Sequence, residues 1–349
     1  MVEHEKYMQR CLELAELGKG MVSPNPMVGA VIVHGDKIIG EGYHHKYGEA
    51  HAEVNAIDQI IITHPDSTQL LKQATIYVSL EPCAHHGKTP PCADLIIKHQ
   101  IPKVVVGCRD PFEAVNGKGI EKLINAGIEV VTGILEKESQ WLNRRFFTRV
   151  QKHRPYIILK WAETADGFFA PADKRQYWIT GLESRKLVHQ WRSEEDAVLV
   201  GKNTAAIDNP RLNVRYGTGK SPIRIVIDRK LELNVRLNIF DQSVEILIFN
   251  EIKTEINGAN KYIALEDFES YVPQYILYQL YLRDIQSIII EGGAHTLNTF
   301  IEANLWDEAR IFTGETNLKV GIKAPRIVGK SGGEYSSGND RLRILYRND

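Results

Sequence analysis

The sequence EAHAEVNAI, residues 49–57, predicts the start of an amphipathic helix that carries His51 and Glu53 one residue apart. Further along the chain, in LEPCAHHGKTPPCADLI, residues 80–96, two cysteines bracket a proline-rich loop. Ligands of an open α/β sheet bind beyond the carboxyl ends of its strands. Because LEPC stands at such an end, the two stretches together indicate an α/β fold with a site at this edge of its sheet.

Alternating β and α segments surround this stretch. The hydrophobic pattern of the first half predicts, in order, a helix (1–20), a hairpin (30–42), a helix (51–62), a strand (74–80), a helix (92–99), a strand (103–108), a helix (119–127), a strand (129–134) and a helix (136–150). This order favours a largely parallel sheet with helices on both faces.

The length of 349 residues predicts two domains, because one domain usually takes roughly 150 residues. A polar stretch over residues 148–154 predicts the linker, so we expect domains over 1–147 and 153–349. The second domain repeats the α/β alternation, with strands at 156–162, 196–201, 222–228, 244–249, 287–293 and 307–314 and helices at 183–193, before Arg283 and at 295–305.

Composition excludes several classes of function. The net charge of −1 gives no general attraction to nucleic acid or to an anionic membrane surface. Residues 1–20 lack the apolar core of a signal peptide, and no apolar run reaches the ~20 residues of a membrane span. The four cysteines are too few for a disulfide framework, and Cys11 and Cys108 are expected to be buried apolar side chains. We expect a cytoplasmic protein with a small-molecule substrate.

Three residues have the types and spacing of a catalytic zinc site, namely His51, Cys83 and Cys92. Such a site takes three protein ligands and leaves a fourth position for water. Cys92 begins a helix, whose dipole favours a thiolate. Glu53 is expected to carry a proton from water to a ring nitrogen and then to a departing amine. A His-x-Glu followed by Pro-Cys and a second Cys is typical of zinc-dependent base deaminases.

Three alternatives stay open from the residues alone. A structural zinc would close its shell with a fourth ligand, and His44, His85 or His86 offers one. A deaminase acting on nucleic acid such as tRNA, with the second half as a binding appendage, is disfavoured by the near-neutral charge. A zinc-stabilised scaffold that binds a nucleotide without turnover is the third.

The motifs SPNPMVGAVIV (23–33), HAEVNAI (51–57) and EPCAHHGKTPPC (81–92) resemble the deaminase half of the bifunctional riboflavin-biosynthesis deaminase/reductases. The eight residues between the two cysteines are similar to this family's longer loop. The resemblance implies a cytidine-deaminase-like three-layer α/β/α domain that hydrolytically deaminates 2,5-diamino-6-(ribosylamino)-4(3H)-pyrimidinone 5′-phosphate. It also implies substrate contacts by Asn25, His44, His85, Lys88 and Asp110. Phe112 stands where relatives commonly carry Asn.

The stretches KWAETADGFFA (160–170), residues 176–215 and IIIEGGAHTLNTFI (288–301) are similar to the reductase half of that family. This implies a dihydrofolate-reductase-like α/β domain that uses NADPH to reduce the ribosyl chain to ribityl, and often a homodimer or tetramer. The family's SLDG motif is TADG here. The cofactor contacts implied are Ala162, Trp178, Thr204, Asp208, Gly293, Ala294, His295, Thr296, Leu297, Asn298 and Thr299. The substrate contacts implied are Gln176, Arg192, Leu212, Arg215 and Glu291.

Physical chemistry supports some of these positions independently. Gly292 and Gly293 end a strand before a helix, so a phosphate can approach the backbone and the unpaired N–H groups there. A guanidinium can grip a phosphomonoester with two parallel hydrogen bonds, which suits the two arginines of the substrate set. Lys160 is a candidate for substrate binding or proton relay, and Arg229 for the 2′-phosphate of the cofactor.

Overall fold

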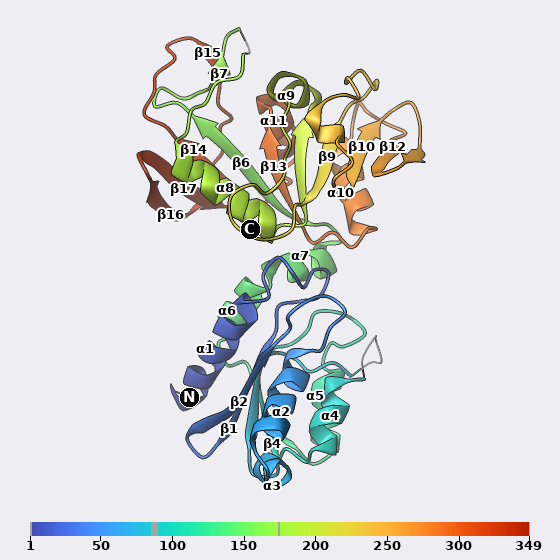
Figure 1. Cartoon of the computed structure of the whole chain (residues 1–349), viewed down its shortest axis with the longest axis vertical. Coiled ribbons are helices and arrows are strands. Elements are labelled where there is room, and N and C mark those ends of the chain that lie inside the picture. The colour runs from blue at the N-terminus through green and yellow to red at the C-terminus, as the bar shows by residue number, and fades with distance from the viewer. Residues whose placement is uncertain (1, 85–89, 174, 349) are drawn as a thin grey trace. The chain divides into compact units, whose positions relative to one another are not determined.

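The computed structural model describes residues 2–84, 90–173 and 175–348. The chain divides into two compact units, residues 1–152 and 153–349, drawn blue to green and green to red in Figure 1. Helix α7 (Arg144–Lys152) occupies most of the stretch predicted as a linker. In the described part of the chain, no helix has the length and apolar character needed to cross a membrane.

The first unit is built on a five-stranded sheet in the order β2-β1-β3-β4-β5. Its strands are β1 (Gly29–His34), β2 (Lys37–Tyr43), β3 (Thr75–Leu80), β4 (Lys103–Cys108) and β5 (Glu129–Thr132). Strands β3, β4 and β5 are parallel, whereas β1 is antiparallel to both of its neighbours. The predicted hairpin and alternation are confirmed, but the hairpin makes the sheet mixed.

Helices cover both faces of this sheet (Figure 1). They are α1 (Val2–Glu16), α2 (Ala52–Thr63), α3 (Ser67–Leu71), α4 (Cys92–Lys98), α5 (Lys118–Asn125), α6 (Glu136–Leu142) and α7. On one face Val31 and Val105 pack with Met8 of α1, and on the other Ile32 and Val104 pack in the core that contains α2 and α4. Strands rich in Val and Ile are buried on both faces, as the sequence pattern requires.

Two local features depart from the predicted helices. The single helix expected over 136–150 is interrupted at Asn143, whose side chain accepts the N–H of Met27 and donates to its carbonyl oxygen, both at 2.8 Å. Helix α2 lies against β2 because Gly42 has no side chain. A Cβ at Gly42 would stand 2.4 Å from the nitrogen of Ala56. This close approach fixes the helix that starts just after His51.

The second unit contains a ten-stranded sheet in the order β11-β12-β10-β9-β8-β13-β6-β14-β17-β16 and a two-stranded sheet, β15-β7. The strands are β6 (Tyr156–Glu163), β7 (Phe168–Pro171), β8 (Ala197–Gly201), β9 (Ile223–Ile227), β10 (Ile246–Asn250), β11 (Glu255–Asn257), β12 (Asn260–Ala264), β13 (Ser287–Gly292), β14 (Glu308–Thr313), β15 (Gly321–Lys323), β16 (Lys330–Ser337) and β17 (Asp340–Tyr346). From β12 to β14 all neighbouring strands are parallel.

Each face of the large sheet has its own core. Its helices are α8 (Leu182–Glu194), α9 (Lys202–Asp208), η1 (Asn238–Phe240), α10 (Val272–Tyr281) and α11 (Ala294–Glu302). Trp191 of α8 packs on one face, and Leu280 of α10 and Phe300 of α11 pack on the other. Residues at the carboxyl ends of β6, β8, β9 and β13 line one cavity together with residues of α9 and α11.

Candidate active sites

The first site forms where β3, α2 and α4 meet. His51 precedes α2, Cys83 follows β3 and Cys92 is the first residue of α4. Their donor atoms all lie within 4.8 Å of one another. The His51 Nδ1 atom is 3.3 Å from Cys92 Sγ and 3.7 Å from Cys83 Sγ. The three residues predicted as zinc ligands are thus brought together.

The chemistry of this donor set fits a zinc ion. A hydrogen bond with Cys92 lowers the pKa of Cys83 to about 4, and the bond with Cys83 raises the pKa of His51. The pKa of Cys92 is raised, first by its hydrogen bond with Cys83 and then by burial. The low pKa of Cys83 favours the thiolate that a metal requires, and zinc binding would displace the proton of Cys92. One imidazole and two thiolates make a three-ligand zinc set with one open corner.

His44 is not free to act as the fourth ligand of a structural zinc. The His44 Nδ1 atom is 3.0 Å from the carbonyl oxygen of Ala50, so it carries the proton, and Nε2 accepts from Asn25 Nδ2 at 3.1 Å. Both ring nitrogens of His44 are therefore engaged, and burial lowers its pKa. Within the described ranges no fourth His, Cys, Asp or Glu joins the cluster. His85, His86 and the predicted substrate residue Lys88 lie outside the described residues.

Glu53 lies in the first turn of α2 and is only 3% exposed. Burial raises its pKa, although the neighbouring His51 acts in the opposite direction. A carboxyl group with a raised pKa beside a metal site can accept and return a proton at neutral pH. Glu53 therefore has the surroundings that the predicted role requires.

Asp110 is the remaining described substrate candidate of this unit. It is 7% exposed, and its Oδ1 atom accepts the N–H of Phe112 at 2.8 Å. Burial raises the pKa of Asp110 to about 7. Its backbone N–H donates to Glu81, a buried residue that the sequence analysis did not select. The only sequence signal for Glu81 is a carboxylate at the end of a buried strand, directly before Pro82.

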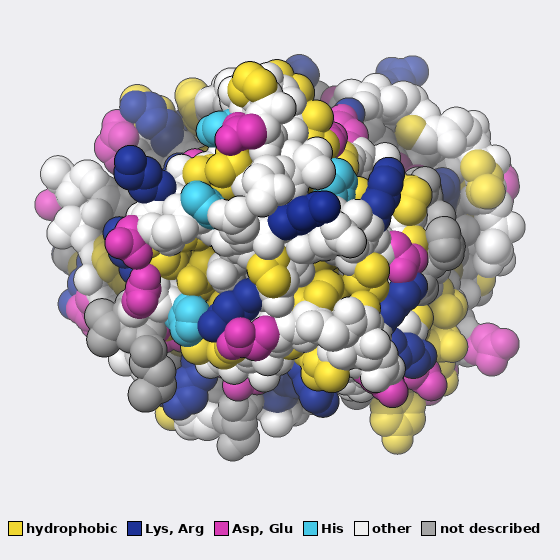
Figure 2. All heavy atoms as spheres, turned by 90° about the horizontal axis from the view of Figure 1, so that it is seen from below, with side chains coloured by type: hydrophobic (Ala, Val, Ile, Leu, Met, Phe, Trp, Pro, Cys, Tyr) yellow, Lys and Arg dark blue, Asp and Glu magenta, His cyan; other side chains and the backbone are white. Residues whose placement is uncertain are grey.

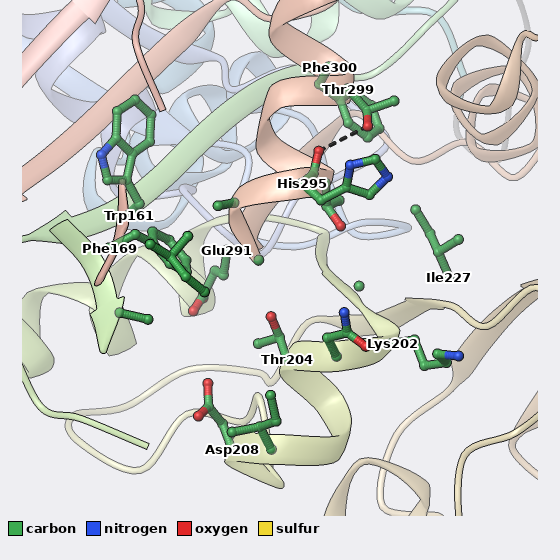
Figure 3. Close-up of a pocket in the computed structure, with 18 of the residues that line it drawn as sticks. Trp161, Phe169, Lys202, Thr204, Asp208, Ile227, Glu291, His295, Thr299 and Phe300 are labelled. Atoms are coloured by element: carbon green, nitrogen blue, oxygen red, sulfur yellow. Dashed lines mark hydrogen bonds between the residues drawn. The ribbon is translucent and has the colours of Figure 1, made fainter. Parts of the chain in front are cut away.

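The second site is a cavity of about 1090 Å³ at the carboxyl ends of β6, β8, β9 and β13 (Figure 3). Most of the predicted cofactor residues line it, namely Ala162, Trp178, Thr204, Asp208, Gly293, Ala294, His295, Thr296 and Thr299. Lys160, Arg229 and Glu291 line it as well. Leu297 is fully buried in the core of the sheet. Asn298, Gln176, Arg192, Leu212 and Arg215 are not among the lining residues.

The backbone at the end of β13 comes close to α9. Gly292 has a φ of +129°, which favours glycine, and a Cβ at Gly293 would stand 3.1 Å from Thr204 Oγ1. Helix α11 begins directly after Gly293, and Thr299 Oγ1 donates to the carbonyl oxygen of His295 at 2.9 Å (Figure 3). Residues 293–296 of this first turn line the cavity, and because a helix leaves its first N–H groups without an internal partner, the turn can receive a phosphate group.

Glu291 is held by two cations. Arg192 Nε and Nη2 donate to its two oxygens, both at 2.7 Å, and Lys160 Nζ lies 3.7 Å away. Burial alone would raise the pKa of Glu291, but Arg192 and Lys160 overcome it and lower the pKa to about 2. For Lys160 burial has the opposite sign: it disfavours the charged ammonium group and so lowers the pKa. Arg192 is thus already engaged by a carboxylate.

Arg215 differs from Arg192 because it is exposed. Its Nη1 atom donates to Asn213 Oδ1 at 3.0 Å, and its backbone N–H donates to His189 Nδ1 at 3.1 Å. Arg229, the candidate for a 2′-phosphate, donates to Glu251 and Glu269, both at 2.6 Å. Of the three predicted phosphate-binding arginines, Arg192 and Arg229 are therefore paired with carboxylates, whereas the guanidinium of Arg215 is accessible.

Comparisons with known proteins cover both units. A family model described as the RibD C-terminal domain matches residues 155–338. One described as the cytidine and deoxycytidylate deaminase zinc-binding region matches residues 1–108. The riboflavin biosynthesis protein RibD of Aquifex aeolicus is 41% identical over 330 residues, covering 93% of this chain and 88% of the relative. RibD of Escherichia coli is 34% identical, covering 89% and 87%.

Solved structures agree over the full length. The diaminohydroxyphosphoribosylaminopyrimidine deaminase/5-amino-6-(5-phosphoribosylamino)uracil reductase of Thermotoga maritima has a TM-score of 0.90 at 37% identity, covering 99% of each chain. RibD of Acinetobacter baumannii has a TM-score of 0.90 at 32% identity, covering 100% of this chain and 99% of the other.

Proposed function

Because this chain belongs to the RibD family of riboflavin biosynthesis proteins, we propose that the residues of its two sites catalyse two successive reactions. The chain is a bifunctional deaminase and reductase, that is, a hydrolase and an oxidoreductase, with a zinc-binding deaminase domain and a reductase domain that uses NADPH. The α/β class predicted for both halves is confirmed. The observation that carries the proposal is the gathering of His51, Cys83 and Cys92 beside the buried Glu53.

In the first reaction, 2,5-diamino-6-(ribosylamino)-4(3H)-pyrimidinone 5′-phosphate loses an amine as ammonia. The donors His51, Cys83 and Cys92 would hold zinc, which when bound supplies a Lewis acid that makes water nucleophilic at neutral pH. Glu53 takes the first proton of the attacking water and passes it to the ring nitrogen, then takes the second proton from the new hydroxyl group and passes it to the leaving amine. Water thus supplies the new carbonyl oxygen, and the amine leaves as ammonia.

Asn25 and Asp110 would bind the pyrimidine and ribose. Because Asn25 Nδ2 donates to His44, its carbonyl oxygen is directed elsewhere and can accept a hydrogen bond from a ring amino group. Asp110, with a pKa of about 7, can present either a donor or an acceptor to a ribose hydroxyl. The family resemblance adds His85 and Lys88 as substrate contacts, and the ammonium group of Lys88 can meet the phosphate.

In the second reaction, NADPH when bound would supply a hydride to C1 of the ribosyl group in its open, imine-like form, and a proton from water to the nitrogen would complete the ribityl amine. We assign the cofactor to the large cavity, where the first turn of α11 can receive a phosphate and Trp178 and Thr204 can border the nicotinamide. Glu291 and Lys160 face the same cavity and can orient the ribosyl chain.

The accessible Arg215 is the better group for the substrate phosphate, whereas Arg192 orients Glu291. Gln176 and Leu212 complete the proposed substrate set by family resemblance. The structure places Leu212 in the core at 2% exposure, with a φ of 52°, so its backbone is the part available for a contact.

A zinc-ligand variant tests the first site. Full-length Cys83→Ser should lose zinc and release no ammonia from the diaminopyrimidine phosphate, while NADPH oxidation on the deaminated substrate continues. Asp58→Asn, an exposed change on α2, is the matched control and should retain zinc and both activities. Ammonia release by a zinc-free Cys83→Ser protein would contradict the assignment of these ligands.

A nucleic-acid substrate is not favoured. Figure 2 shows Lys and Arg side chains interspersed with Asp and Glu over the face that it presents, in keeping with the net charge of −1. Retention of tRNA on a filter, lost on raising the salt concentration, would contradict the small-molecule assignment.

We also propose a cytoplasmic homo-oligomer, a dimer or tetramer, as family resemblance implies. Light scattering of the purified chain measures that state.

A further inference from the structure

Glu81 is a buried carboxylate, 4% exposed, two residues before Cys83. Its backbone N–H continues the sheet by donating to the carbonyl oxygen of Cys108 at 3.0 Å. Each carboxylate oxygen accepts two backbone N–H groups: Oε2 those of Asp110 (3.3 Å) and Gly117 (2.9 Å), and Oε1 those of Gly119 (3.0 Å) and Ile120 (3.3 Å). A single side chain therefore holds both ends of the segment 110–120.

Two of these donors belong to the first turn of α5. The residue before the helix, Gly117, has no side chain that could accept them. Helices leave their first N–H groups without an internal partner, and a carboxylate there is favoured by the helix dipole. Glu81 thus caps α5 from a distant strand, and the four bonds offset the cost of burying its charge.

A second contact ties the same segment to the metal-ligand strand end. A Cβ at Gly119 would stand 1.9 Å from the carbonyl oxygen of Pro82, so the backbone of α5 packs directly on the residue that precedes Cys83. Cys83 itself is held independently by α4, because the N–H of Ala93 donates to its carbonyl oxygen at 3.1 Å and that of Cys92 to its Sγ at 3.3 Å.

We propose that Glu81 is a positioning residue of the deaminase site, which fixes Asp110 relative to Cys83 so that substrate can bridge them. The inference rests on the proposed function of Asp110 as a substrate contact. A Gln at position 81 offers one oxygen acceptor and turns its NH₂ group toward two N–H donors. Two of the four bonds are then lost, and the segment 110–120 moves while the independently held Cys83 stays in place.

The test measures binding without turnover, in zinc-loaded full-length protein carrying Glu53→Ala. Titration calorimetry with the diaminopyrimidine phosphate should give a Kd at least tenfold weaker when Glu81→Gln is added. Glu121→Gln, the same change at an exposed position of α5, should leave the Kd within twofold. Zinc content and NADPH oxidation on the deaminated substrate should stay unchanged in both.

Two further variants separate positioning from a merely structural role. Glu81→Asp keeps both carboxylate oxygens and should recover part of the affinity. If Glu81 acts through Asp110, the double variant Glu81→Gln/Asp110→Asn should bind no more weakly than Asp110→Asn alone. An unchanged Kd in Glu81→Gln, loss of its zinc, multiplicative effects in the double variant, or no recovery in Glu81→Asp would each overturn the inference.

The result that would contradict the proposed function differs from those that would contradict the role of Glu81. Substrate binding without ammonia release by the unmutated protein would contradict the deaminase assignment and leave the Glu81 inference standing. An unmutated protein that does not bind the diaminopyrimidine phosphate would contradict both.

Discussion

Removal of Glu291 should destabilise the second unit more than removal of its partner Arg192. Glu291→Gln leaves two buried cations, Arg192 and Lys160, without a carboxylate. Arg192→Met still leaves Lys160 at 3.7 Å from Glu291. The asymmetry follows from which charges each change leaves unpaired in a buried environment.

The expected loss of stability follows from the burial of the ion pair and from the pKa of the Glu291 carboxyl group. Breaking a buried ion pair costs about 3–5 kcal/mol. The pKa of Glu291 falls from 4.5 to about 2, which corresponds to about 3–4 kcal/mol at about 1.4 kcal/mol per pH unit. We expect a loss of about 4–5 kcal/mol for Glu291→Gln and about 3 kcal/mol for Arg192→Met.

Differential scanning calorimetry and urea unfolding of the full chain measure these losses in the transition of the second unit. Glu183→Gln is the matched control, because Glu183 pairs with Lys186 on the exposed side of the same helix α8 and its loss should cost less than about 1 kcal/mol. A greater loss of stability for Arg192→Met than for Glu291→Gln, or losses in both no larger than in the control, would contradict the role of Glu291 as the shared partner of the two cations.

Three further predictions concern stability. Burial and Arg192 lower the pKa of His189 to about 4, so the neutral ring stabilises the fold fully above pH 6.5 and this stability is lost as the pH falls toward 4. The urea midpoint should therefore decline between pH 6.5 and pH 4. His189→Asn, which keeps an acceptor for the N–H of Arg215, should make that decline smaller. Gly42→Ala should push α2 away from β2, lower the melting temperature and weaken zinc binding in a competition assay. Gly35→Ala strains a turn at a φ of +57°, but its Cβ meets nothing within 4 Å, so it should leave zinc affinity unchanged even if the melting temperature falls. Asn143→Ala should cost about 2–3 kcal/mol in chemical unfolding because it leaves the buried N–H and carbonyl groups of Met27 unpaired; a loss below about 0.5 kcal/mol would contradict that account.

The alternation of strands and helices was predictable because buried strands such as β4 and β8 are continuous apolar runs. Strand β16 was missed because it is an edge strand whose side chains are largely exposed, so SGGEYSS has no hydrophobic alternation. The break in the predicted helix at Asn143 was missed because its cause is a contact with Met27, far away in the sequence.

The zinc donor set was predictable because its three residues lie at the ends of helices and strands whose hydrophobic patterns are clear in the sequence. The partners of the selected residues were not predictable. Arg192 was expected to meet a phosphate, but the fold places Glu291 against it. Glu81 was not selected, because its four N–H donors come from a segment that only the packing of α5 brings near it. Sequence patterns give the location of a site more readily than the pairing of charges within it.

The role of Glu53 at the zinc site is tested by following ammonia release and NADPH oxidation separately on the diaminopyrimidine phosphate, with zinc-loaded protein and its Glu53→Ala variant. We expect the unmutated protein to release ammonia before any NADPH is oxidised, whereas Glu53→Ala should do neither on this substrate and should still oxidise NADPH on the deaminated one. Ammonia release that survives Glu53→Ala, or a zinc-loaded unmutated protein that releases none, would contradict the central claim.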